Sequence, residues 1–381
     1  MGEIVVVYHY FAHYRKPVLM ELNNQLADVG KLHFVADRSS NEPNLKLIDE
    51  LDFINCKNSL FHNVKNIWVC GFLWQKGLAS RLSEINPDVI IFLGQFNFIT
   101  TWFLAILYRL KGRKVIFWGH GIYGNEGIIK KSIRNIFNCL PTTYMTYGNY
   151  AKSLMLKQWF SPQRIEVIFN SLDVLEQDKN YNLLEGEYET QDFYDLAKDA
   201  FNIVFIGRLT KIKRLDLLFQ AVSDLINDGV LIKLELIGDG PELNMLKRFA
   251  FELNIQKNII FHGQQHSEDY ISKILFRSHI CVSPGNVGLT AMHSLAYGTP
   301  VITHDNFSMQ MPEFEAIQDG INGSFFKYNN GRSLKEKILY WINAYKDKER
   351  REIKCLCRKI IFEKYNPSTQ AKIIKEVIVN D

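Results

Sequence analysis

Residues 205–213, FIGRLTKIK, combine a glycine with cations in a way that suits phosphate. Gly207, Arg208 and Lys213 follow an apolar strand and stand at the entrance to a helix. A guanidinium can donate to two phosphate oxygens at once, an ammonium adds a point charge, and the first amides of a helix attract anions. The segment therefore predicts a diphosphate site. From these residues alone, a solvated basic turn is the alternative.

A second segment, residues 283–306, reads SPGNVGLTAMHSLAYGTPVITHDN. An apolar strand precedes it, a helix is predicted from near Gly288 to Gly298, and another strand follows. Strand, glycine turn and helix is a common way to hold a nucleoside diphosphate. Acidic groups that would bind sugar hydroxyls are missing, since Gly285 and His293 occupy the positions where they are expected.

Apolar strands alternate with helical patterns along most of the chain, which predicts an α/β fold with parallel sheets covered on both faces. The strands are predicted at residues 4–8, 32–36, 89–93, 115–118, 144–147, 166–169, 203–206, 233–237, 259–262, 280–283 and 301–303, with helices such as 17–26, 214–226 and 242–252.

The chain has 381 residues, which favours two domains. A polar acidic stretch lies between the two strand-rich halves. The predicted organisation is an N-terminal acceptor-binding domain over 1–173, an acidic linker over 174–200, a C-terminal nucleotide-sugar-binding domain over 201–355, and a helical segment over 356–381 that crosses back to the first domain.

Several classes of protein are disfavoured. The six cysteines have neither CxxC pairs nor a spacing typical of zinc ligands, and no D-x-D triplet that would hold a divalent metal occurs. The loop after the first strand, YHYFAHYRKP, has no glycine, which argues against a dinucleotide site, and no P-loop or nucleic-acid-binding motif is found. Without a signal peptide or an apolar stretch long enough to span a bilayer, the chain is predicted to be cytoplasmic.

Positive charge is concentrated between residues 105 and 165, which carry ten basic residues and one acidic residue, Glu126. Within this region a helical stripe is formed by Ile129, Ile133, Ile136, Phe137 and Leu140, with Lys130, Lys131 and Arg134 on its other side. One interpretation is a helix packed in the core. The other is peripheral binding to an anionic membrane surface, on the inner face of the cell membrane, that carries a lipid-linked acceptor.

The order of motifs after residue 203 resembles the C-terminal domain of retaining glycosyltransferase family 4, also called glycosyl transferases group 1. The resemblance covers residues 203–326 closely and is looser before residue 200. Its motifs are Gly207-Arg208-Leu209…Lys213, Ile237-Gly238-Asp239-Gly240-Pro241, His262-Gly263, Gly285…Gly288-Leu289…His293…Gly298-Thr299-Pro300-Val301 and Glu315…Asp319-Gly320.

This resemblance implies a GT-B fold, with two Rossmann-like parallel-sheet domains facing a central cleft. It implies a retaining, metal-independent transferase that moves a sugar from a nucleotide donor, UDP- or GDP-linked, to a glycan or lipid-linked acceptor. Such a transferase would act in surface polysaccharide, lipopolysaccharide or glycolipid biosynthesis. No other cofactor and no nucleic acid are expected.

The residues implied for the site fall into three groups. The catalytic group is His120, Arg208 and Lys213; the donor-binding group is Gly207, Gly285, Asn286, Gly288, Leu289, His293 and Glu315, with Glu313 as the alternative to Glu315; the acceptor-binding group is His9, His13 and Arg15. A packed surface loop is an equal alternative for the third group. A buried histidine bonded to a backbone carbonyl is the alternative for His120, although flanking glycines favour a site.

The sequence departs from the family where Gly285 and His293 replace the two carboxylates of an E-x7-E motif. Either the donor sugar differs or the copy is inactive, and the retained Arg208 and Lys213 favour an active enzyme. A side chain at residue 285 is predicted to enter the sugar's space, and His293 is predicted to accept from a ribose hydroxyl while its other nitrogen donates within its helix. A sugar-nucleotide epimerase and a carbohydrate-binding or regulatory subunit are the alternatives.

Overall fold

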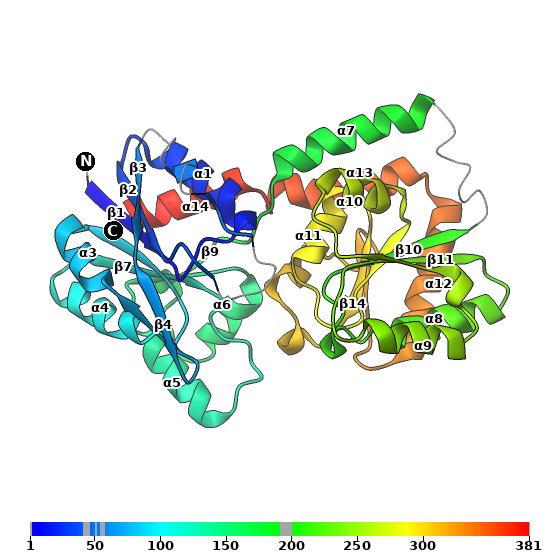
Figure 1. Cartoon of the computed structure of the whole chain (residues 1–381), viewed down its shortest axis with the longest axis horizontal. Helices are drawn as coiled ribbons and strands as arrows, with labels where there is room; N and C mark the ends of the chain where they lie inside the picture. The colour runs from blue at the N-terminus through cyan, green and yellow to red at the C-terminus, as the bar shows by residue number, and fades with distance from the viewer. Residues whose placement is uncertain (1, 41–45, 50–51, 54–57, 191–199, 381) are drawn as a thin grey trace. The chain divides into compact units, whose positions relative to one another are not determined.

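The computed structural model of the chain describes residues 2–40, 46–49, 52–53, 58–190 and 200–380 (Figure 1). It divides into two compact units. The first contains residues 1–172 and 366–381, and the second contains residues 173–365. The chain thus leaves the first unit once and returns to it for its last helix.

The first unit is built on a seven-stranded parallel sheet with the order β3-β2-β1-β6-β7-β8-β9. Its strands are β1 (Gly2–Val7), β2 (Gly30–Ala36), β3 (Ser59–Asn63), β6 (Val89–Leu93), β7 (Lys114–Gly119), β8 (Thr143–Thr146) and β9 (Ile165–Val167). Most central strand residues are buried on both faces, which explains why their sequences are continuous apolar runs.

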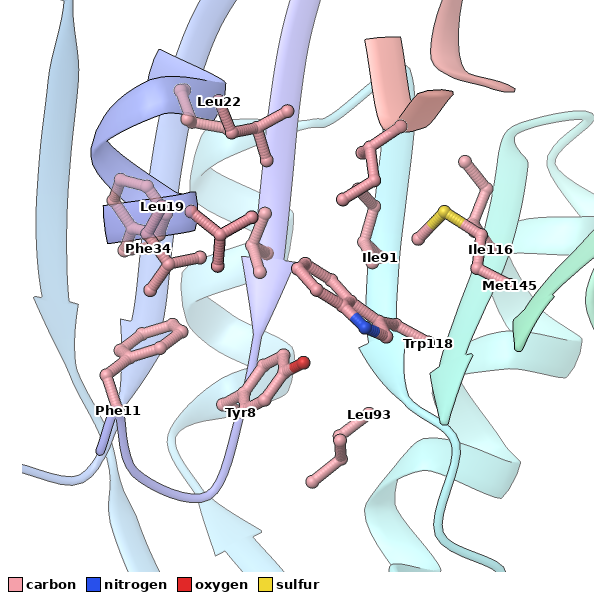
Figure 2. Close-up of a cluster of buried hydrophobic side chains, with 14 of the residues drawn as sticks. Tyr8, Phe11, Leu19, Leu22, Phe34, Ile91, Leu93, Ile116, Trp118 and Met145 are labelled. Atoms are coloured by element: carbon pink, nitrogen blue, oxygen red, sulfur yellow. The ribbon is translucent and has the colours of Figure 1, made fainter. Parts of the chain in front are cut away.

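Helices cover both faces of this sheet. They are α1 (Lys16–Leu26), α3 (Leu78–Ile85), α4 (Ile99–Leu110), α5 (Ile128–Asn138), α6 (Asn149–Leu156) and α14 (Pro367–Val379). Helices α1 and α14 pack together, and Leu19 and Ile374 belong to one buried cluster, part of which is drawn in Figure 2. Leu82 and Leu104, from α3 and α4, belong to the cluster on the opposite face.

A short antiparallel hairpin also belongs to the first unit. Its strands are β4 (Lys65–Val69) and β5 (Phe72–Lys76). The sequence did not predict this hairpin or β3, because both mix apolar and polar residues over only five positions. Several large apolar side chains of the hairpin, including Trp68, Phe72 and Trp74, are exposed.

The second unit contains a six-stranded parallel sheet with the order β12-β11-β10-β13-β14-β15. Its strands are β10 (Phe201–Ile206), β11 (Ile232–Ile237), β12 (Ile259–Gly263), β13 (Ile280–Val282), β14 (Val301–His304) and β15 (Gly323–Phe326). All but β15 were predicted from apolar runs. Two parallel, Rossmann-like sheets confirm the predicted α/β class.

The helices of the second unit are α7 (Val174–Thr190), α8 (Leu215–Asn227), α9 (Leu243–Glu252), α10 (Glu268–Arg277), α11 (Leu289–Ala296), α12 (Gly331–Asp347) and α13 (Arg350–Glu363). The predicted acidic linker, 174–200, is therefore helical over α7, which packs on α10 and α11. Residues 191–199 of that linker lie outside the described residues. Within the predicted segment 356–381, α13 belongs to the second unit and α14 to the first.

In both sheets the strand order reverses at one point. In the first unit the strands that follow β1 are added on one side of it and the strands that follow β6 on the other side of the sheet. In the second unit the same reversal occurs between β10 and β13. Ligands of open parallel sheets bind beside the carboxyl ends of the strands at such switch points. Topology therefore selects the loops after β1, β6, β10 and β13 as places to search for a site.

No helix among the described residues combines the length and the apolar character required to cross a bilayer.

Candidate functional site

Three loops meet at the switch point of the second unit. They are the loop after β10 with Gly207 to Lys213, the turn after β13 with Ser283 to Gly288, and the short helix η7 (Pro312–Ala316). The Gly285 amide donates to the Lys213 carbonyl at 2.9 Å, and Lys213 Nζ donates to the Asn286 carbonyl at 2.7 Å. The two segments that the sequence singled out are therefore in direct contact.

A third motif positions the first of these loops. The Leu209 amide donates to the Asp239 carbonyl at 2.9 Å, so the loop after β10 lies on the loop after β11. A Cβ added at Gly238 would meet the Gly207 carbonyl oxygen at 2.0 Å, and one at Gly240 would meet that of Leu209 at 2.2 Å. The glycines of this motif are therefore required for backbone contact between the two loops.

Arg208 is exposed at this switch point. In the described part of the chain its guanidinium has neither an ion-pair partner nor a hydrogen bond. The neighbouring cation Arg214, in contrast, is paired with Asp216. Arg208 can therefore bind an anionic ligand without first breaking an internal contact.

Lys213 is half-buried, and its ammonium faces both a carbonyl and a carboxylate. Burial lowers the pKa of Lys213, and the charge of Glu313 acts in the opposite direction. Burial and then the charges of both Glu315 and Glu313 raise the pKa of Tyr365, whereas only Glu313 acts on Lys213. Of the two glutamates considered from the sequence, Glu313 is thus the one placed beside Lys213.

The reason for glycine at position 285 differs from the predicted one. A Cβ there would meet the Ile212 carbonyl oxygen at 2.0 Å and Lys213 Cα at 2.7 Å. A side chain at 285 would thus start inside the backbone of the neighbouring loop, not in open space for a sugar. The expectation that it would fill the sugar's space is wrong, because Gly285 serves the packing that holds Lys213.

The helix α11 begins at Leu289, with Gly288 as its N-cap residue and without a side-chain hydrogen bond that caps it. Just before it, the Val287 amide donates to Gln310 Oε1 at 2.7 Å, while Thr290 Oγ1 donates to the Ile206 carbonyl at 2.9 Å. These bonds fix the helix start beside β10. Its first amides add a partial positive charge near the cations of the adjacent loop.

His293 contacts a carboxylate from another helix. Its Nε2 lies 2.8 Å from Glu268 Oε1 on α10, and Tyr297 donates its hydroxyl to the same oxygen at 2.6 Å. Burial would raise the pKa of Glu268, but the His293 ring and hydrogen bonds from His293 and Tyr297 hold it below its usual value. The predicted partner within its own helix is thus replaced by Glu268. In the neutral ring Nε2 carries the proton and Nδ1 is the acceptor.

The first unit gathers other predicted residues at the carboxyl end of its sheet. His9 follows β1, Arg15 ends a 3-10 turn (His13–Arg15), and His120 follows β7. Burial, with a further contribution from the charge of Arg15, lowers the pKa of both His9 and His120 to about 4. The rings of His120 and Tyr147 lie 4.9 Å apart. His13 is exposed, in contrast to Arg15.

Among the described residues, no group of three or more His, Cys, Asp or Glu side chains is arranged to hold a metal ion. The residues that sequence reasoning missed are Glu268, Trp118 and Tyr147. The sequence could have indicated Trp118 and Tyr147 as site residues, because each lies at the carboxyl end of a predicted strand. It could not have indicated Glu268, which is 25 residues from His293 in sequence.

Residues 188–354 match the family model described as glycosyl transferases group 1. The alpha-monoglucosyldiacylglycerol synthase of Streptococcus pneumoniae is 36% identical over 106 residues, which are 27% of this chain and 24% of that enzyme. The chain thus spans about a quarter of the length of that relative. It spans 26% of the poly(glycerol-phosphate) alpha-glucosyltransferase of Bacillus subtilis, to which it is 23% identical over 43% of its own length.

Solved structures are similar over the whole chain. A glycosyltransferase from Rickettsia africae has a TM-score of 0.71 at 16% identity, with 100% of this chain and 99% of that chain covered. The Anabaena protein HepE, crystallised with UDP, has a TM-score of 0.70 at 13% identity, with 99% of each chain covered. At these identities the likeness shows the fold. The predicted GT-B class is thereby confirmed.

Replacing Gly285 by alanine tests whether this position serves packing. We expect Gly285→Ala to lower the free energy of unfolding by about 1–3 kcal/mol, since the added Cβ overlaps the backbone at residues 212 and 213. Inorganic diphosphate should bind more weakly, because Lys213 is displaced. Gly331→Ala is the control, with its nearest neighbour, Leu217 Cδ2, at 3.8 Å. Denaturant titration and calorimetry measure both effects. Wild-type behaviour of Gly285→Ala would contradict the packing role.

Replacing His293 by glutamate tests its contact with Glu268. The sequence alone predicts that His293→Glu keeps or improves nucleotide binding, but it would place two carboxylates together in a partly buried site. Each carboxylate then raises the pKa of the other. The free energy of unfolding is therefore lowered at pH values above the raised pKa, where both carboxylates are ionised. This loss disappears as pH falls and the carboxylates become protonated. It amounts to about 1.4 kcal/mol for every tenfold change in the acid dissociation constant.

We therefore expect the melting temperature of His293→Glu to lie further below the wild-type value at pH 8 than at pH 5. Adding Glu268→Gln should recover most of the loss at pH 8. The exposed His266 provides the control substitution, His266→Glu, with no comparable pH effect. If His293→Glu alone melts at the wild-type temperature at pH 8, residues 293 and 268 do not interact.

Proposed function

Because residues 188–354 match the family model of glycosyl transferases group 1, we propose that the chain is a retaining glycosyltransferase. It would move a sugar from a nucleoside diphosphate to a glycan or lipid-linked acceptor in surface polysaccharide, lipopolysaccharide or glycolipid synthesis. The observation that carries the proposal is the Arg208 guanidinium, unpaired among the described residues, on the same loop as Lys213 at the second switch point.

These groups suit the charge that develops when a sugar leaves a diphosphate. In the proposed reaction the bond between the anomeric carbon and the diphosphate oxygen breaks, and the acceptor hydroxyl attacks from the same face and passes its proton to the departing diphosphate. Arg208 donates to the oxygens that become more negative, with Lys213 and the first amides of α11 next to it. Lys213 and the start of α11 are held in place by the hydrogen bonds described above, and donors that need not reorient during reaction stabilise developing charge effectively.

The donor is proposed to be UDP- or GDP-linked, with no resident metal. Arg208 and Lys213 offer two positive charges toward a diphosphate, which is the role a divalent cation has in other transferases. The charge of Glu313 favours the charged form of Lys213 and opposes the effect of burial on the pKa of Lys213. The Nδ1 atom of His293 is the acceptor proposed to face the ribose.

His120 is proposed to contact a sugar hydroxyl as a neutral ring. Burial, followed by the charges of Arg15 and Arg134, lowers the pKa of His120 to about 4, so the ring is uncharged near pH 7. A neutral imidazole can donate one hydrogen bond and accept another, which suits a hydroxyl. General acid catalysis by His120 would require a far higher pKa and is not proposed.

Binding to an anionic membrane surface is proposed through α5. The core interpretation of its apolar stripe is wrong for most of the stripe, since Ile129 is 79% and Ile136 is 61% exposed, while Phe137 is buried. Arg134, predicted on the wet side, is instead buried against Glu126. Lys130 and Lys131 therefore remain as the cations beside the exposed isoleucines. An exposed apolar stripe with adjacent lysines is typical of helices that lie in a membrane interface.

Replacing Arg208 tests the diphosphate role. We expect Arg208→Ala to weaken UDP or GDP binding about 10- to 100-fold, which corresponds to the roughly 1.5–3 kcal/mol of a charge-assisted hydrogen bond. Arg248→Ala, which removes an exposed charge on α9, should bind as the wild type does. Calorimetry with a panel of nucleotides and sugar nucleotides makes the measurement. If the wild type binds none of them, the proposed function is wrong; if Arg208→Ala binds normally, only its role is wrong.

Removing the charges and the isoleucines of α5 tests the membrane surface. Each lysine near an anionic bilayer contributes about 1 kcal/mol, so Lys130→Ser with Lys131→Ser should weaken binding to phosphatidylglycerol vesicles at least tenfold. Ile129→Ser with Ile136→Ser should weaken it further, and salt should weaken the wild type. Lys157→Ser, at an exposed site on the same unit, is the control. Equal sedimentation of the wild type with phosphatidylcholine and phosphatidylglycerol vesicles would contradict the electrostatic part.

A further inference from the structure

The first unit buries a positive charge that has no counter-ion among the described residues. Arg15 is only 9% exposed. Within that part of the chain no carboxylate lies within ion-pair distance of its guanidinium. Its sequence neighbour Lys16, by contrast, pairs with Asp52 at 2.6 Å. A buried cation without a paired anion is costly, so such a group calls for an explanation.

Aromatic rings surround the Arg15 guanidinium. Its Cζ lies 5.3–5.5 Å from the ring centroids of Tyr8, Trp118 and Tyr147, and its Nη2 donates to the Tyr147 hydroxyl. Attraction to the ring faces and one hydrogen bond offset part of the desolvation cost. They leave Nη1 buried without a hydrogen-bond partner in the described structure. The rings thus hold the guanidinium in place and leave one of its edges unused.

Further buried polar atoms without partners lie around this guanidinium. Trp118 Nε1, His120 Nδ1 and His9 Nδ1 are each buried and make no hydrogen bond to any described residue. Their residues come from the carboxyl ends of β1 and β7, and Figure 2 shows Tyr8 and Trp118 there with their rings next to each other. Buried polar groups are almost always hydrogen-bonded in native proteins. Several unpaired atoms at one switch point indicate that a ligand completes them.

The chemistry of these atoms selects the ligand. A guanidinium nitrogen and an indole nitrogen can only donate, so both require an acceptor. A neutral hydroxyl could accept from them but would leave the charge of Arg15 uncompensated. We propose that Arg15 and Trp118 bind an oxyanion, a phosphate or a carboxylate, that belongs to the acceptor substrate. This inference rests on the proposed glycosyltransferase function and narrows its acceptor to anionic glycans or lipid-linked phosphates.

The two histidines fit this arrangement as neutral neighbours. Burial, and then the charge of Arg15, lowers the pKa of His9 and His120 to about 4. Arg15 is therefore the cation of the cluster near pH 7. The histidine nitrogens remain available for hydroxyls next to the oxyanion. One charge with several neutral partners matches a sugar that carries a single acidic group.

Calorimetry with three related probes tests the proposal. The full chain is titrated with glucuronate, glucose 6-phosphate and glucose, with UDP or GDP, whichever binds more tightly, present at saturation to occupy the diphosphate site of the second unit. We expect at least one anionic probe to bind ten times more tightly than glucose. The tighter of the two anionic probes distinguishes a carboxylate from a phosphate. Arg15→Gln should remove this preference, Arg15→Lys should retain part of it, and Lys16→Gln should leave it unchanged.

Other outcomes would overturn the proposal. Equal binding of all three probes to the wild type would mean that Arg15 is structural, and this comparison does not depend on whether Arg15→Gln folds. A tenfold loss of UDP affinity in Arg15→Gln, with the anion preference kept, would mean that Arg15 holds the donor. If the wild type binds neither UDP nor GDP, the proposed function fails, and the same probe ranking, measured without nucleotide, judges Arg15 separately.

Discussion

Direct contact between backbones, permitted only by glycine, is the constraint on which the second unit's site depends. Gly238 lies against the Gly207 carbonyl, Gly240 against that of Leu209, and Gly285 against that of Ile212. Each contact brings two loops closer than any side chain would allow. The loop with Arg208 and Lys213 is thereby held between the loops after β11 and β13. Its position follows from packing, before any ligand binds.

This constraint changes the meaning of the motifs. In sequence, glycines that surround cations suggest a backbone that wraps around phosphate, and the missing carboxylates suggest an altered pocket. In the structure the same glycines place one loop on another, and the cations project from that assembly. The carboxylates near the site come from elsewhere, since Glu313 lies near Lys213 and Glu268 bonds His293. The lack of an acid at positions 285 and 293 therefore does not leave this region without negative charge.

Much of the fold could be predicted from the sequence because parallel strands buried on both faces are continuous apolar runs. The hairpin β4–β5 and the strand β3 could not, since short strands with a polar face resemble loops. The positions of Arg208 and Lys213 at the second switch point follow from their place after β10. The contact of His293 with Glu268 does not, because it depends on how α10 packs on α11. Likewise, the loop sequence YHYFAHYRKP does not by itself show that Arg15 is buried.

The two switch points use positive charge in different physical ways. Arg208 is exposed and loses little by staying hydrated until an anion arrives, so it suits a diphosphate that binds and leaves in each cycle. Arg15 is buried among aromatic rings, so it loses its hydration when the protein folds. Ligand binding therefore does not have to remove water from this guanidinium. A preorganised, desolvated cation discriminates strongly between a charged and a neutral partner, because interactions strengthen where water is excluded. Exposed charge thus favours exchange of the ligand, and buried charge favours selection among ligands.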